Sequence, residues 1–116
     1  MLDFIKGLFG KAEKAYEDLH NEAFAAKLKS TSKAMLLDVR HKHEFDQEKM
    51  PNAINMDVMM PNFAEKMKHY DKDKSYFVYC QSGRRSAKAC NTLAKMGFQN
   101  LVNLKGGINQ FTGKTV

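Results

Sequence analysis

The chain has 116 residues, enough for one domain with a single hydrophobic core and too few for a second domain of similar size. Its formal net charge of +6 makes an anionic partner plausible. The lysines are scattered and lack the interleaved aromatic residues of nucleic-acid platforms, so nucleic acid is not an expected partner.

The N-terminal residues 1–15 form a segment apart from the domain expected at 16–116. Leu2, Ile5 and Phe9 recur at helical spacing and predict a short amphipathic helix. Asp3, Lys6 and the short length argue against a signal peptide or a membrane span. We expect this helix to dock on the domain's own surface; contact of residues 1–10 with a membrane or a partner is the less favoured alternative.

Strand-like and helix-like segments alternate along the rest of the chain. In chain order, the patterns predict a capped helix at 21–29, a strand at 34–40, a short helix at 41–48, a strand at 53–56, a helix at 62–70, a strand at 76–79, a helix at 86–96 and a strand at 101–104. In the helix at 86–96, the inward side should carry Ala87, Cys90, Leu93 and Ala94. This alternation predicts an α/β fold with a mostly parallel sheet.

Cys80 lies where the apolar strand at 76–79 meets a short loop and the helix that follows. Unpaired backbone N–H groups converge in such a loop, and the helix N-terminus adds partial positive charge. Arg84 and Arg85 add two full charges, and Gly83 permits a tight backbone turn. We therefore expect Cys80 to be substantially ionised at neutral pH and to act as a nucleophile.

Other polar groups near predicted strand ends have two interpretations each. Asp38 and Arg40 fall at the carboxyl edge of the sheet and form either an ordinary ion pair or a support for the site. Cys90 is expected to pack in the core, with a resolving cysteine as the alternative. His41 and His43 should diverge on a helix, so we do not expect a metal site there. Both cysteines are expected to be reduced, which favours a cytoplasmic location.

Three separated motifs, taken together, resemble one family. They are Leu-Leu-Asp-Val-Arg at 36–40 followed by Glu44 and Phe45, Ala-Ile-Asn at 53–55, and Tyr-Cys-Gln-Ser-Gly-Arg-Arg-Ser at 79–86 with Gly-Phe at 97–98 and Leu-Lys-Gly-Gly at 104–107. In this order and spacing the chain is similar, over about residues 16–111, to a single-domain rhodanese-like sulfurtransferase. It departs from the family pattern at 48–52, where Glu-Lys-Met-Pro-Asn stands in place of Gly-His-Ile-Pro-Gly.

The resemblance implies a sheet of about five strands flanked by helices, with Cys80 carrying sulfur as a persulfide. It implies that the backbone amides of Gln81, Ser82, Gly83, Arg84 and Arg85 surround that sulfur. Arg84 would lie near the pocket mouth, and Arg85 would tie the loop to an acidic residue, Asp38 or Glu44. The donor would be a small anion such as thiosulfate, attracted by Arg84 and Arg40, and the acceptor a small thiol, a protein cysteine or cyanide. No metal or organic cofactor is implied.

Two other function classes stay open. A tyrosine-phosphatase-like or arsenate-reducing enzyme also has a cysteine in an arginine-containing anion loop, but with five residues between Cys and Arg, whereas four separate Cys80 from Arg85 here. A non-catalytic rhodanese-like binding module is the other alternative, and the presence of Cys80 argues against it.

Overall fold

The computed structural model describes residues 14–116. The helix predicted for residues 1–15 therefore lies almost wholly outside the described residues, and it stays a prediction.

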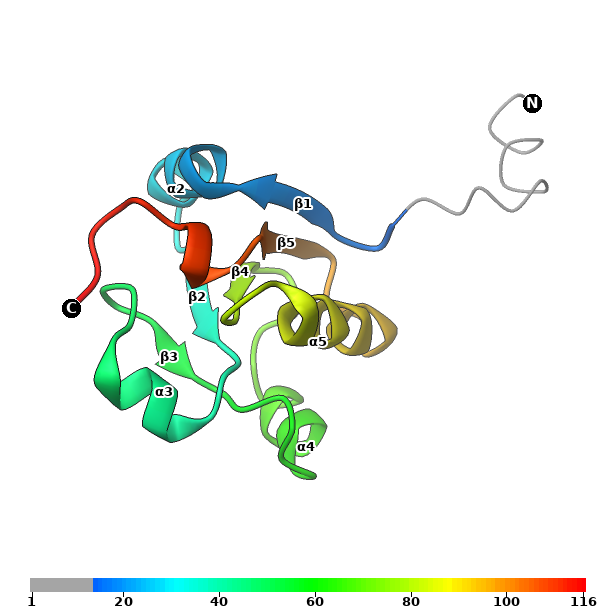
Figure 1. Ribbon diagram of the computed structural model, residues 1–116. Helices are drawn as coiled ribbons and strands as arrows, with labels where there is room; N and C mark the ends of the chain where they lie inside the picture. The colour runs from blue at the N-terminus through cyan, green and yellow to red at the C-terminus, as the bar shows by residue number, and fades with distance from the viewer. Residues whose placement is uncertain (1–13) are drawn as a thin grey trace.

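A five-stranded sheet forms the centre of the fold, with strand order β1-β5-β4-β2-β3 and all four neighbouring pairs parallel (Figure 1). The predicted α/β class with a parallel sheet is confirmed. The strands are β1 (Glu17–His20), β2 (Met35–Asp38), β3 (Ile54–Asn55), β4 (Ser75–Tyr79) and β5 (Asn100–Lys105).

The four helices predicted within residues 16–116 are all present. They are α2 (Asn21–Ser30), α3 (Lys42–Gln47), α4 (Phe63–Met67) and α5 (Arg84–Lys95), and a 3-10 turn, η1 (Ile108–Gln110), follows β5. Helix α5 begins two residues earlier than predicted, because Gly83 takes a φ of 103° and turns the chain straight into the helix. Its inward face was predicted only in part: Cys90 and Leu93 are buried, but Ser86 and Ala89 are buried in place of Ala87 and Ala94, which are half-buried.

Strand β1 has no counterpart among the strands predicted from local patterns. Its sequence, Glu-Asp-Leu-His, contains one apolar residue and therefore shows neither an apolar run nor clear alternation. The strand lies at the edge of the sheet and pairs only with β5, and edge strands tolerate charged side chains.

Each face of the sheet covers its own apolar core. On one face, Phe63 and Met67 of α4 and Leu93 of α5 pack on the sheet. On the other face, Phe24 of α2 meets Phe77 of β4 edge to face, with ring centroids 5.4 Å apart. Because β4 is covered on both faces, its apolar run is continuous, as expected for a central parallel strand.

Helix α2 starts at Asn21 as predicted, but the expected side-chain cap is absent. Asn21 has a φ of 24°, and its side chain bonds to Thr112 instead, accepting from the Thr112 backbone N–H at 2.9 Å. The residue therefore ties the start of α2 to the C-terminal segment that follows η1.

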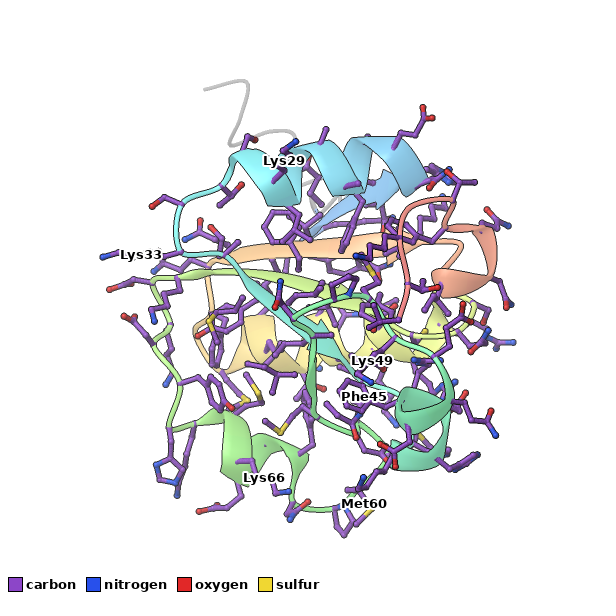
Figure 2. All side chains as sticks on the ribbon, turned by 90° about the vertical axis from the view of Figure 1, so that its left-hand side faces the viewer. Lys29, Lys33, Phe45, Lys49, Met60 and Lys66 are labelled. Carbon is purple, nitrogen blue, oxygen red and sulfur yellow. The ribbon has the colours of Figure 1, made fainter. Side chains whose placement is uncertain are left out.

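The segment that departs from the family pattern, 48–52, is held by contacts from three directions. Lys49 exchanges two backbone hydrogen bonds with Val116, and the Met50 N–H donates to the Tyr79 hydroxyl. The Lys49 ammonium lies over the ring of Phe45, and Figure 2 shows these two side chains next to each other. The cation–π contact, the Tyr79 hydroxyl and the pairing with the C-terminus thus hold this loop, which has neither the histidine nor the glycine of the family pattern.

Within residues 14–116, no helix has both the length and the apolar character that crossing a bilayer requires.

Candidate functional site

Cys80 follows directly after β4, and α5 begins four residues later. This short connection aims the first N–H groups of the helix back at the end of the strand. The Gly83 N–H donates to Cys80 Sγ at 3.0 Å, and the Ser86 N–H donates to the same atom at 3.3 Å. Sγ thus lies at a helix N-terminus with two donors directed at it, an arrangement that stabilises negative charge on sulfur.

The Ser86 hydroxyl is a third polar group at the sulfur. Its Oγ lies 3.3 Å from Cys80 Sγ and 3.2 Å from the Gly83 carbonyl oxygen. The hydroxyl has one proton and two acceptors within reach, so it can donate either to the carbonyl or to an anionic sulfur. Ser86 is fully buried, so its hydroxyl is out of contact with bulk water.

Cys80 is only 1 % exposed, so the site admits a slim reactant. Arg84 and Ser82 lie exposed beside it, whereas Gln81, Gly83 and Arg85 are half-buried. Of the five backbone amides that the resemblance placed around the sulfur, only that of Gly83 donates to Cys80 Sγ, and the second donor, Ser86, was not among them.

The turn between β5 and η1 is hydrogen-bonded to the cysteine loop. Ile108 N–H donates to the Cys80 carbonyl at 2.9 Å, and Asn109 N–H donates to the Gln81 carbonyl at 3.1 Å. Gly107, with a φ of 66°, makes this approach possible, because a Cβ there would lie 2.2 Å from the Gln81 carbonyl oxygen. Gly107 is thus required by close backbone contact with the cysteine loop, whereas a Cβ at Gly106 would meet the Gln110 side chain.

Asp38 and Arg40 form a buried ion pair, in which the Arg40 guanidinium donates to both carboxylate oxygens. Arg40 also donates to the Glu48 carbonyl at 2.6 Å and to the Gln81 side-chain oxygen at 3.1 Å. Because Arg40 is 2 % exposed and bound on all sides, the expectation that it attracts an anionic donor does not fit. Its contact with Gln81 makes it a support for the loop.

Arg85 forms its ion pair with Glu44 and not with Asp38. Its two terminal nitrogens donate to the two Glu44 carboxylate oxygens at 2.8 and 3.0 Å. The bidentate contact with Arg85 lowers the pKa of Glu44 to about 2, and the same contact raises the pKa of Arg85. The pair links α5 to α3 across the cysteine loop.

The prediction that His41 and His43 diverge is wrong. Their rings stack, with centroids 5.8 Å apart. His41 precedes α3 as its N-cap residue, so the two residues do not follow helical spacing. His41 Nδ1 lies 2.7 Å from Asp57 Oδ2, and its backbone N–H donates to Glu44. Among residues 14–116, no three His, Cys, Asp or Glu side chains come together as a metal site.

Cys90 is fully buried within the core between α5 and the sheet, and burial raises the pKa of its thiol to about 12. Both properties support the interpretation of Cys90 as a packing residue.

The site does not coincide with the cleft of about 390 Å³ on the surface of the protein. That cleft lies at the opposite edge of the sheet, between residues 14–17 and 99–102. It contains neither cysteine, and the groups that converge on Cys80 are a stronger indication of chemistry.

Sequence reasoning missed three contributors to the site. Ser86 was assigned to the helix and not to the sulfur, although its position directly after the two arginines could have suggested a first-turn donor. Asn109, which accepts a hydrogen bond from the Gln81 amide, and Asp57, which meets His41, have no local signal. Only the tertiary arrangement of the loops brings them to this edge.

Comparison with known proteins adds family context. The Rhodanese-like domain family matches residues 20–114. YtwF of Bacillus subtilis, provisionally named a sulfurtransferase, is 33% identical over 99 residues, covering 85% of this chain and 93% of YtwF. A protein of Allochromatium vinosum named sulfurtransferase is 31% identical over 91 residues, covering 78% of this chain and 83% of its own. The crystal structure of a rhodanese-related protein from Thermoplasma volcanium is 29% identical, with a TM-score of 0.75 over 87% of this chain and 98% of that one.

The Glu44–Arg85 pair predicts a specific loss of stability in acid. The pKa of Glu44 in the folded chain is about 2, below its ordinary value of 4.5, so the pair stabilises the fold above about pH 4.5 and this contribution is lost as the pH falls toward 2. We expect the free energy of unfolding of the wild type to fall between about pH 5 and 2.5 by roughly 1–2 kcal/mol more than that of Glu44→Gln, measured by urea denaturation. The control is Glu65→Gln, which removes an exposed ion pair with Lys68. Parallel curves for wild type and Glu44→Gln would contradict the assignment.

Gly107→Ala should destabilise the protein through a direct clash with the cysteine loop. Gly97→Ala is the matched control, because Gly97 has a similar left-handed φ of 101° but its Cβ would meet only the flexible Lys72 side chain, at 3.4 Å. We expect Gly107→Ala to lower the free energy of unfolding by about 1–3 kcal/mol more than Gly97→Ala. Equal losses in urea denaturation would show that conformational strain alone, without the clash, explains the glycine.

Proposed function

The chain belongs to the rhodanese-like domain family, and we propose that it is a sulfurtransferase that carries sulfane sulfur as a persulfide on Cys80. One observation carries the proposal: Cys80 Sγ accepts hydrogen bonds from the Gly83 and Ser86 backbone N–H groups at the N-terminus of α5. Catalysis of sulfur transfer requires a sulfur nucleophile that is stable as an anion before and after it is loaded, and fixed N–H dipoles meet that need.

The first step loads the cysteine. The Cys80 thiolate attacks the outer sulfur of a donor such as thiosulfate, a new S–S bond forms to Cys80, and the S–S bond of thiosulfate breaks. Sulfite leaves with the electron pair of that bond. The Ser86 hydroxyl, which has both Sγ and the Gly83 carbonyl within reach, can turn its proton toward the charged sulfur.

The second step unloads it. An acceptor thiolate, or cyanide in an assay, attacks the outer sulfur of the persulfide, and the bond to Cys80 Sγ breaks. The Cys80 thiolate is restored, so loading and unloading balance without an external oxidant or reductant. Neither step calls for a metal or an organic cofactor.

Two features of the site favour sulfur transfer over phosphate-ester hydrolysis. Both terminal nitrogens of Arg85 are bound to Glu44, so this arginine does not offer a bidentate fork to a phosphoryl group in the loop. Cys80 is 1 % exposed, which suits a single sulfur atom approaching end-on better than a tetrahedral phosphate. The same donors at Sγ favour a catalytic protein over a binding module that only keeps the fold.

We extend the proposal to the setting of the reaction. Residues 16–116 would form the rhodanese-like domain, with 1–15 as an appended amphipathic segment. Cys80 and Cys90 are free thiols, which supports a reducing compartment such as the cytoplasm. Arg84, exposed at the rim, would attract the anionic donor.

Cys80→Ser should abolish sulfur loading, because an alcohol is a far weaker nucleophile toward sulfur than a thiolate. Intact-protein mass spectrometry after thiosulfate treatment should show a gain of one sulfur atom in the wild type and none in Cys80→Ser. Transfer to cyanide should fall by more than about a thousandfold. Cys90→Ala is the control and should still load. Loading of Cys80→Ser, or loss of loading in a folded Cys90→Ala, would refute the role of Cys80.

Arg84→Ala should weaken donor binding with little effect on stability. The side chain is exposed and forms no ion pair with residues 14–116, so its loss removes charge at the rim and little packing. At low salt we expect the KM for thiosulfate to rise about two- to fivefold, as for an exposed charge pair, with kcat nearly unchanged. Lys95→Ala removes a cation from the far end of α5 and should leave KM unchanged. An unchanged KM in Arg84→Ala would count against this role.

A further inference from the structure

Helix α5 runs from the Cys80 loop with cations on its solvent side. Arg84, Lys88 and Lys95 are exposed and occupy positions i, i+4 and i+11, so they share one face of the helix. We call this set the α5 basic face. The helix contains no acidic residue in its twelve positions, so nothing within α5 offsets this charge.

In the described part of the chain, no salt bridge joins the α5 basic face to an acidic side chain of another element. Within residues 14–116, no ion pair includes Arg84, Lys88 or Lys95. By contrast, Arg85, which follows Arg84 in the same helix, is paired with Glu44 of α3. A row of unneutralised cations that starts at a reactive cysteine creates a positive field at the entrance to that cysteine. An anionic surface would be complementary to it.

Two exposed apolar side chains, Met59 and Met60, lie in the segment before α4. Met59 and Met60 are 52% and 51% exposed, and in the described part of the chain only Val116 is another large apolar side chain so exposed. A cleft of about 250 Å³ next to Met60 is lined by Phe63 and by the cations Lys42 and Lys66. Figure 2 shows Met60 and Lys66 at the same edge of the molecule, in and before α4.

A chain of polar contacts fixes these methionines relative to the cysteine loop. The Met59 N–H donates to Asp57 Oδ1 at 2.9 Å, and Asp57 Oδ2 meets His41 Nδ1 at 2.7 Å. The His41 N–H in turn donates to Glu44, which binds Arg85. These contacts connect the segment that carries Met59 and Met60 to Arg85 of α5, and we call the α5 basic face together with these two methionines the rim.

We propose that this rim binds a protein whose sulfur-accepting cysteine lies in an acidic surface with an apolar side chain beside it. The inference rests on the proposed function, since it names the acceptor of the Cys80 persulfide. Acidic side chains of the partner would meet the α5 basic face, and its apolar side chain would contact Met59 and Met60. The partner's thiolate then attacks the outer sulfur, and Cys80 leaves as a thiolate.

Composition of the rim favours a protein over other partners. A small thiol needs no surface beyond the loop itself. A single-stranded nucleic acid would use aromatic side chains for base stacking, and α5 has none among its twelve residues. Exposed methionine and arginine are enriched at protein interfaces, where charge complementarity speeds and orients encounter.

The test uses the full chain and two synthetic peptides. One carries a single cysteine flanked by glutamates and a leucine, and the other has lysines in place of the glutamates. We expect the acidic peptide to take sulfur from thiosulfate-loaded protein about tenfold faster than the basic peptide at low salt, with the difference shrinking as salt rises. Lys88→Glu/Lys95→Glu should remove this preference and leave transfer to cyanide unchanged. Met60→Ser should slow transfer to the acidic peptide only.

Lys29→Glu/Lys74→Glu is the matched control, with the same change of charge on exposed lysines of α2 and the turn before β4; Lys29 is labelled in Figure 2. It should keep the wild-type preference. An equal preference in wild type and Lys88→Glu/Lys95→Glu would overturn the proposal, as would tighter binding of a single-stranded RNA oligonucleotide to the same face.

Binding of fluorescent peptides in which serine replaces the cysteine separates this proposal from the assigned activity. Charge-dependent binding that Lys88→Glu/Lys95→Glu abolishes supports the docking surface even where no persulfide forms, and in that case only the sulfurtransferase assignment fails. A protein that loads sulfur but binds both peptides equally retains its activity and refutes the docking surface.

Discussion

The site depends on the short path from β4 to α5. Only Cys80 and three further residues separate the end of the strand from the first residue of the helix. This short connection directs the N–H groups of Gly83 and Ser86 at Cys80 Sγ. The same constraint explains why Gly83 takes a left-handed φ and why α5 starts earlier than its apolar pattern indicates.

Two supports keep that path in place, and both lie outside the loop. The β5–η1 turn holds the Cys80 and Gln81 carbonyls through Ile108 and Asn109, and the Arg40 guanidinium holds the Gln81 side chain. A buried ion pair such as Asp38–Arg40 contributes little net stability, because desolvation offsets the attraction between the charges. The ion pair instead fixes the position of the Arg40 guanidinium. Each of its nitrogens has a hydrogen-bond partner, and one of those partners, Gln81, belongs to the cysteine loop.

Much of this arrangement could be predicted from the sequence, because continuous apolar runs and the Cys-Gln-Ser-Gly-Arg-Arg-Ser stretch have local causes. The strand–loop–helix junction follows from residues close in the chain, whereas the tie from Arg85 to an acidic residue was implied by the resemblance to the family, since Glu44 lies 41 positions away. Strand β1 could not be predicted, since its formation depends on pairing with β5, more than eighty residues away. The burial of Arg40 could not be predicted for the same reason, because its partners include Gln81, 41 residues away. The stacking of His41 on His43 has a local cause: His41 is the extended N-cap residue of α3 and does not follow the helical spacing that was assumed for it.

The central claim is that the Gly83 and Ser86 amides bind the sulfur of Cys80 and respond to its charge. Backbone amide NMR spectra of the full chain test this directly when recorded before thiosulfate, after thiosulfate, and after cyanide. The account predicts that the Gly83 and Ser86 resonances move furthest on loading and return on unloading, while amides of α2 stay in place. Loading that leaves these two resonances unmoved, or moves them no more than those of α2, would contradict it.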